Sequence, residues 1–130
     1  MKNDKARAYF GHSSQSYNTE AEKRILKVLR EKYRVICPNE DIGRLEPFNR
    51  YLNIVGWSDM LVIWEYLGFL TIDVYNEAKH ALKLDIPVFV VRESPSGYLF
   101  ARVERVDYNQ GRVNPDLYGK IILQTNGSPL

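Results

Sequence analysis

The chain has 130 residues and a net charge of +2, with 45% hydrophobic and 26% charged residues. This length and composition are typical of one globular domain and exclude a disordered chain. Basic residues alternate with acidic ones, so no basic stripe is offered to a phosphate backbone, and nucleic acid is not an expected partner. The longest apolar run, Met60 to Trp64, is too short to span a membrane.

We therefore expect a single domain over residues 1–130, with no membrane partner. The polar start, Met1 to Lys5, lacks the pattern of a signal peptide, which favours a cytoplasmic protein. Residues 126–130, which begin with an Asn-Gly-Ser-Pro sequence, predict a loose tail.

The first half of the chain predicts strands and a helix in turn. Ala6–Gly11 is short, apolar and ends at a glycine, as a buried strand does. Thr19 followed by Glu22 predicts a capping box, in which each side chain bonds the backbone amide of the other, at the start of an amphipathic helix. Arg34–Cys37 predicts a second strand, which Pro38 ends.

The middle of the chain continues the alternation. Residues 38–46 predict a loop, and Pro47 can open a helix that runs to about Trp57. Met60–Trp64 is continuously apolar, which is typical of a central strand covered on both faces. A helix from about Thr71 to Leu84 and a buried strand, Pro87–Val91, follow.

The final third is less regular. Tyr98–Val106 predicts a strand or hairpin, Asn114–Asp116 a turn, and Lys120–Gln124 a last strand. Strands that alternate with helices predict right-handed crossovers and a parallel sheet. We expect an α/β, flavodoxin- or Rossmann-like three-layer domain with strand order 2-1-3-4-5. In that order a ligand crevice lies beyond the carboxyl ends of the first and third strands.

The loop after the first strand is a candidate for substrate binding. It carries Gly11, His12, Ser13 and Ser14, but neither the dinucleotide fingerprint nor the Walker sequence. Its glycine, its hydroxyls and the helix N-terminus beyond them would suit a phosphate or a sugar hydroxyl. The alternative is a polar loop that only crosses to the helix, with His12 in solvent.

Glu77 is the most informative residue of the helix over 71–84. At helical spacing it falls inside the apolar arc, next to Ala81 and Leu84, so its carboxylate should point toward the sheet or the crevice. An unpaired buried carboxylate costs several kcal/mol or raises its own pKa, which predicts that Glu77 is paired or used. The alternative is that Glu77 turns out to solvent and complements the helix dipole.

The other polar candidates have structural explanations that are their default readings. Asp59 reads as a turn residue, Thr71 and Asp73 as caps of the helix, and Tyr9 as a core tyrosine whose hydroxyl is bonded. Cys37 reads as a structural thiol, because no histidine lies near it in sequence. No spacing predicts a metal site, and no cofactor is expected.

Three motifs together resemble those of the nucleoside 2-deoxyribosyltransferase superfamily. They are Ala8-Tyr9-Phe10-Gly11 at the end of the first strand, Ser58-Asp59-Met60-Leu61-Val62 at the head of the third, and Asn76-Glu77-Ala78-Lys79-His80-Ala81 in the helix. Each is short, and the resemblance lies in their order and spacing, from about Ala6 to Arg92.

The resemblance implies catalysis on an N-glycosidic bond of a nucleoside or nucleotide. Glu77 would be the nucleophile, Tyr9 would orient it, and Asp59 would line the base and sugar site. Thr71 and Asp73 join the loop residues as candidates for substrate binding. The family often completes its site from a neighbouring subunit, which implies a homo-oligomer.

Two other functions remain open from the sequence. The aspartate Asp73 stands where the family has a glycine-containing turn, which favours a non-catalytic nucleotide-binding or sensing module of the same fold. The tyrosines and arginines of the final third could instead form a protein contact.

Overall fold

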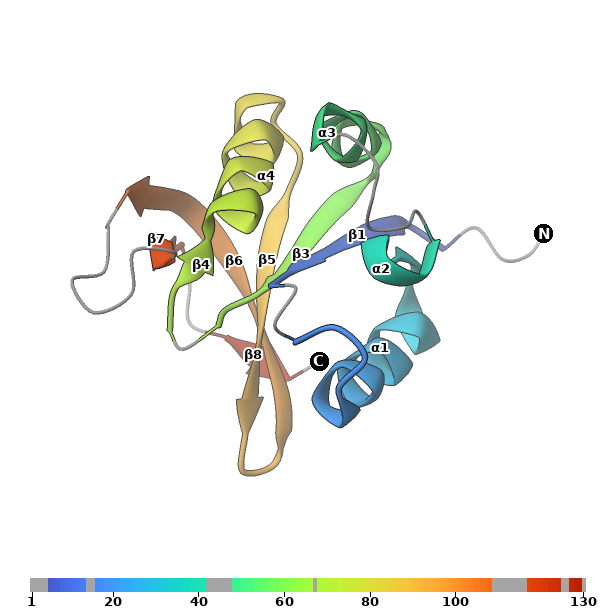
Figure 1. Ribbon diagram of the computed structural model, residues 1–130. Helices are drawn as coiled ribbons and strands as arrows, with labels where there is room; N and C mark the ends of the chain where they lie inside the picture. Colours follow the sequence, from blue (N-terminus) through green and yellow to red (C-terminus); the bar gives the residue numbers. More distant parts are fainter. Residues whose placement is uncertain are drawn as a thin grey trace.

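The computed structural model describes residues 5–13, 16–41, 48–66, 68–108, 117–124 and 127–129. Within these residues the chain has an α/β architecture, in which eight strands form one mixed sheet. Helices cover both faces of its parallel half, with α3 and α4 on one side and α1 on the other (Figure 1). The strands are β1 (Arg7–His12), β2 (Arg34–Ile36), β3 (Met60–Trp64), β4 (Leu70–Thr71), β5 (Val88–Ser94), β6 (Gly97–Tyr108), β7 (Leu117–Leu123) and β8 (Ser128–Pro129). The helices are α1 (Glu20–Lys32), α2 (Pro38–Asp41), α3 (Phe48–Trp57) and α4 (Ile72–Lys83).

Four strands form the parallel half of the sheet, in the order β2-β1-β3-β5. β1 is central: Ala8 pairs with Val35 of β2 on one side and with Met60 of β3 on the other. Each parallel neighbour is reached through a helical connection, as the alternating pattern predicts. The carboxyl ends of β1 and β3 therefore lie side by side.

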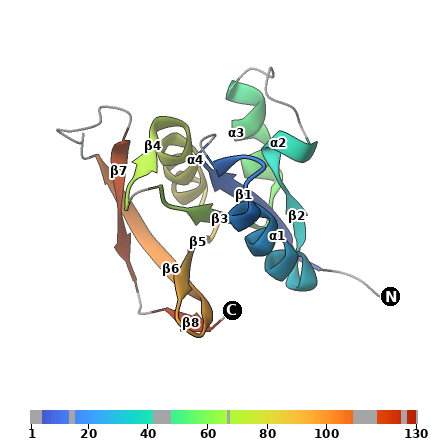
Figure 2. The same ribbon diagram turned by 60° about the horizontal axis from the view of Figure 1, so that its bottom comes forward.

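Beyond β5 the sheet turns antiparallel, which the expected all-parallel sheet did not include. Pro95 and Ser96 alone join β5 to β6, and so short a connection permits a hairpin but no crossover. Gly97 takes a φ of +134° at this turn, a conformation that suits glycine. The order continues β6-β7-β4, which extends the sheet away from α1, α2 and α3 (Figure 2).

Three short segments differ from the sequence-based expectation, and one of them is the strand β4, which was not expected and pairs with β7. Pro38–Asp41 forms the helix α2 where a loop was expected, because the proline suits a first helical position and Asp41 N–H donates to the Cys37 carbonyl at 2.8 Å. Ser128–Pro129, within the expected loose tail, pairs as β8 with Leu99 and Phe100 of β6. The expected turn at 114–116 lies outside the described residues.

The core is divided by the sheet into two apolar clusters. Along β1, Tyr9 packs with residues of α3 and α4, whereas Ala8 and Phe10 pack with Ile25 and Leu29 of α1. The alternation follows from the two-residue repeat of a strand, whose successive side chains point to opposite faces. No helix among the described residues is long and apolar enough to cross a membrane.

Candidate functional site

Glu77 and Tyr9 form a buried pair on the α4 face of β1. The Tyr9 hydroxyl donates to Glu77 Oε2 at 2.5 Å. Tyr9 is fully buried and Glu77 is 5% exposed. The carboxylate therefore points toward the sheet, as its place on the apolar arc of the helix predicts, and finds its partner on the strand that the motif order singles out.

Gly11 provides the space that the Glu77 carboxylate occupies. It is two residues after Tyr9 on β1, so both face α4. A Cβ built on Gly11 would lie 3.0 Å from Glu77 Oε1. Any larger residue at this position would displace the carboxylate, which gives the glycine of the motif a physical reason.

Burial controls the ionisation of the pair. It raises the pKa of Glu77 to about 8, the hydrogen bond from Tyr9 lowers that pKa, and the charge of Asp73 raises it. Burial, followed by the charge of Glu77, raises the pKa of Tyr9 well above its ordinary range. Tyr9 therefore stays protonated and donates, whereas Glu77 can change its charge near neutral pH.

Tyr17 is a residue of this region that the sequence analysis missed. Its pKa is raised to about 12, chiefly by burial and then by the charge of Glu77, with smaller contributions from Tyr51, Cys37 and Asp73. Its ring also meets the edge of the His12 ring, with centroids 5.0 Å apart. Nothing in the sequence marks Tyr17, because a tyrosine between a strand and a helix cap follows no periodic pattern.

The two expected binding residues at the start of α4 differ in their positions and contacts. Thr71 occupies the N-cap position, but its side chain makes no capping hydrogen bond. Asp73 is exposed in the first turn, one helical turn before Glu77, where its charge acts on the carboxyl. After β1, Ser13 is buried, and Ser14 lies outside the described residues.

Asp59 is not brought together with Glu77 and Tyr9. It precedes β3, at the amino-terminal edge of the sheet, where it accepts the backbone N–H of Arg7 at 2.8 Å and pairs with that guanidinium. The Arg7 N–H and then its guanidinium hold the pKa of Asp59 below its usual range. Asp59 thus ties β3 to β1, as its reading as a turn residue allows, and its role in lining a sugar site stays a prediction.

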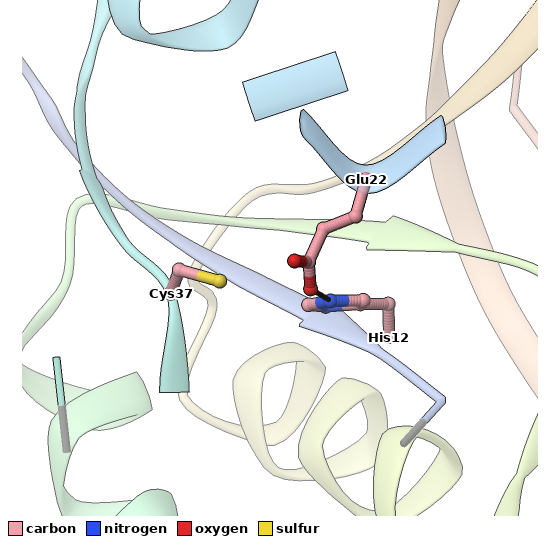
Figure 3. A group of neighbouring side chains, drawn as sticks. All are labelled: His12, Glu22 and Cys37. Atoms are coloured by element: carbon pink, nitrogen blue, oxygen red, sulfur yellow. Dashed lines mark hydrogen bonds and ion pairs between the residues drawn. The ribbon is translucent and has the colours of Figure 1, made fainter. Parts of the chain in front are cut away.

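The opposite face of β1 carries a second polar cluster that spacing did not predict. His12, Glu22 and Cys37 meet beneath α1, and their ligating atoms all lie within 4.8 Å of one another (Figure 3). His12 is 4% exposed, so it is a strand residue of the core and not a solvated loop histidine. Cys37 does have a histidine beside it, because the carboxyl ends of the parallel strands β1 and β2 are adjacent.

Glu22 explains why the capping box is only half correct. Thr19 Oγ1 accepts the Glu22 backbone N–H at 3.1 Å, as predicted. The Glu22 carboxylate, however, accepts the backbone N–H of Asn18 at 2.9 Å and meets His12 Nε2 at 2.5 Å. The capping-box pattern therefore explained Glu22 as a helix residue and gave no indication that its carboxylate belongs to this cluster.

Comparison with known proteins identifies no relative: no family model, no curated protein and no solved structure matches this chain.

Proposed function

We propose that the chain cleaves or transfers an N-glycosidic bond of a nucleoside or nucleotide, with Glu77 as the nucleophile. The observation that carries this proposal is the buried Glu77 carboxylate, held by the Tyr9 hydroxyl at 2.5 Å. Burying a carboxyl group costs free energy, and among the described residues the Tyr9 phenol is the donor to Glu77, so stability alone does not explain its place. Its pairing with Tyr9 fits the resemblance to the nucleoside 2-deoxyribosyltransferase superfamily.

The proposed chemistry uses the two carboxylate oxygens differently. Oε2 keeps the hydrogen bond from Tyr9, which fixes the carboxylate, and Oε1 lies toward Gly11, in the space that a side chain at that position would take. In the first step a carboxylate oxygen bonds to the anomeric carbon while the bond to the base nitrogen breaks, and the base leaves with that electron pair. In the second step water or an acceptor attacks the same carbon, loses a proton and restores Glu77.

The pKa of Glu77 sets the pH range of this chemistry. The nucleophile must be ionised, and with a pKa of about 8 roughly a tenth of it is ionised at pH 7. We therefore expect kcat/KM to rise with pH up to about 8.

The position in the sheet also supports the proposal. The order β2-β1-β3-β5 matches the first four strands of the expected flavodoxin-like winding, in which the chain reverses direction between the first and third strands. We propose that the parallel half of the sheet and the helices on its two faces form a flavodoxin-like three-layer arrangement. Tyr9 and Gly11, on β1, would then lie near the point where the chain reverses direction. The antiparallel strands extend it on the far side.

The experiment is a screen for released base. The chain is incubated with nucleosides, 2′-deoxynucleosides, their monophosphates and NAD, and free base is measured by chromatography. We expect release from at least one class, and Glu77→Gln should reduce it at least 1,000-fold, since an amide cannot replace the attacking oxygen. Glu31→Gln, on the exposed face of α1, is the matched control. No release from any substrate, or equal rates in Glu77→Gln, contradicts the proposal.

One observation favours a second function, a non-catalytic nucleotide-binding module. A Glu77 carboxyl that is mostly protonated at neutral pH can donate a hydrogen bond to a base or sugar instead of attacking it. In that case a nucleotide should raise the thermal midpoint without being consumed, and Glu77→Gln should keep binding. The homo-oligomer that the resemblance implies stays a prediction, which light scattering can check.

A further inference from the structure

We propose that His12, Glu22 and Cys37 form a binding site for a divalent transition metal ion of the Zn²⁺ type. Among the described residues, these three bring one nitrogen, one sulfur and one carboxylate ligand within 4.8 Å of one another. His12 is 4% exposed, and Glu22 and Cys37 are fully buried. This inference is independent of the proposed chemistry of Glu77.

The fold holds the three side chains from three separate elements. His12 is the last residue of β1, Glu22 lies in the first turn of α1, and Cys37 follows β2 directly (Figure 3). Each comes from an element whose backbone is fixed by the sheet or by the Thr19 cap. Such prior ordering favours metal binding, because little conformational entropy remains to be lost on binding.

The hydrogen bonds of His12 leave its Nε2 atom as the ligand. Nδ1 lies 3.3 Å from the Phe10 carbonyl oxygen, which can only accept, so this contact is a hydrogen bond in the tautomer whose proton is on Nδ1. In that neutral tautomer Nε2 has a lone pair, and it faces Glu22 Oε2 at 2.5 Å. Two lone pairs at that separation repel each other unless a proton or a metal ion neutralises them.

The Phe10 contact is also the arrangement commonly found behind a metal-bound histidine, whose second nitrogen donates to a carbonyl or carboxylate. Glu22 is oriented in the same manner, since its Oε1 accepts the Asn18 backbone N–H at 2.9 Å. A metal ion held by both side chains would separate Nε2 and Oε2 to roughly 3.4 Å, a shift of about 1 Å.

Charge balance favours a dication in this buried site. The neutral imidazole, the Glu22 carboxylate and a Cys37 thiolate together carry two negative charges, which Zn²⁺ cancels, and a neutral assembly avoids the cost of burying net charge. The mixed nitrogen, sulfur and oxygen ligands suit Zn²⁺ or Co²⁺, whereas Mg²⁺ and Ca²⁺ prefer oxygen alone.

Asn39 contacts two of the three side chains, Cys37 and Glu22. Its Oδ1 accepts from Cys37 Sγ at 2.9 Å, and its amide nitrogen is 3.5 Å from Glu22 Oε1. When the thiol loses its proton to bind the ion, this Oδ1 becomes available as a fourth ligand, which gives the tetrahedral number that zinc prefers. The ion would then tie β1, α1 and β2 together.

The test uses the untagged protein, stripped with a chelator and titrated with Zn²⁺ or Co²⁺. We expect one equivalent of Co²⁺ to produce a near-ultraviolet thiolate-to-cobalt charge-transfer band. Because Cys37 is the one cysteine of the sequence, such a band can come from no other residue. Excess Zn²⁺ should abolish the band and raise the thermal midpoint by on the order of 5–10 °C.

Two variants assign the site. Cys37→Ser should lose the charge-transfer band and most of the thermal shift. His80→Gln, which alters the other histidine of the sequence, on α4, should retain both. The absence of a band and of any Zn²⁺-dependent shift in the unaltered protein overturns the proposal and leaves a shared proton between His12 and Glu22. This readout on the unaltered protein does not require that any variant folds.

Discussion

A buried glutamate lies against each of the two faces of β1, and the two differ in the hydrogen bonds that their carboxylates accept. On the α4 face, Glu77 accepts the Tyr9 hydroxyl, and burial raises its pKa to about 8. On the α1 face, Glu22 meets His12 and also accepts a backbone N–H from Asn18. Among the described residues Glu22 thus has several hydrogen-bond partners, whereas Glu77 has the Tyr9 phenol, and burial raises the pKa of Glu77, the proposed nucleophile.

The comparison also shows how one strand serves both faces. On the α4 face, Tyr9 supplies the phenol that binds Glu77, and Gly11 leaves the space for its carboxylate. On the α1 face, Phe10 packs in the core and His12 supplies the imidazole beside Glu22. A substitution on one face should therefore leave the chemistry of the other face largely intact.

Among substitutions that alter the α4 face of β1 and leave the α1 face unchanged, Tyr9→Phe should have the largest effect on base release. Without the phenol the Glu77 carboxylate loses the donor that lowers its pKa, so that pKa should rise further. We expect base release at pH 7 to fall about 100-fold, and the rising limb of the kcat/KM profile to move to higher pH.

Steady-state rates across pH 5–10 measure both changes. The matched control is Tyr33→Phe, at the C-terminal end of α1, whose profile should overlay that of the unaltered protein. If Tyr9→Phe also overlays it, the phenol has no part in the activity.

Gly11→Ala should have the next largest effect. The added Cβ would lie 3.0 Å from Glu77 Oε1 and would displace the carboxylate by a few tenths of an ångström. We expect about a tenfold loss of kcat/KM and a loss of about 1–3 kcal/mol in the free energy of unfolding. Kinetics together with denaturant titration measure these, and Gly56→Ala on α3 is the control that should retain activity. Full activity in Gly11→Ala would show that the carboxylate has room to spare.

The stability of the chain should depend on pH through Glu77. The ordinary pKa of a glutamate is 4.5, and burial raises that of Glu77 to about 8 in the folded chain, so the folded state binds the extra proton between these values. The stabilisation is complete below pH 4.5 and is lost as pH rises through 8, with a slope of up to about 1.4 kcal/mol per pH unit.

Urea titrations at several pH values measure this slope. Glu77→Gln should lose it, while Glu22, on the other face, remains unchanged in both proteins. A slope that is identical in the two proteins would assign the pH dependence to a group other than Glu77.

The smallest expected effect is that of Asp59→Asn. Asp59 pairs with Arg7 at the amino-terminal edge of the sheet, whereas the Glu77 carboxylate lies by Gly11, toward the carboxyl end of β1. We expect base release to change by less than about twofold, since the substitution does not reach Glu77 or Tyr9. Kinetic assays under the conditions used for Glu77→Gln measure it, and a loss as large as that of Glu77→Gln would support the role that the motif order first suggested.

The parallel half of the sheet and the orientation of Glu77 could be predicted from sequence, because both follow from local periodicity. Met60–Trp64 is apolar throughout and forms β3 over those same residues. Glu77 falls on an apolar arc and is buried. The antiparallel end could not be predicted as readily, since the direction of β6 relative to β5 depends on the length of the turn at Pro95 and Ser96.

The second cluster escaped prediction for a topological reason. His12 and Cys37 are 25 residues apart, and they meet only because β1 and β2 are parallel neighbours. Glu22 also has the expected sequence of a capping residue, so its spacing explained it without reference to another strand. For Asp59 the motif position could not predict the contact with Arg7, because a motif position by itself does not fix the edge of the sheet on which a residue lies.

Covalent trapping tests the central claim most directly. A 2-deoxy-2-fluoro nucleoside slows hydrolysis of a glycosyl ester, because the fluorine destabilises the oxocarbenium-like transition state of the second step. We predict that mass spectrometry of the intact chain and of its peptides finds one fluorosugar on the peptide that contains Glu77, and none in Glu77→Gln. Base release without an adduct, or an adduct on a peptide that lacks Glu77, would contradict the assignment of Glu77 as the nucleophile.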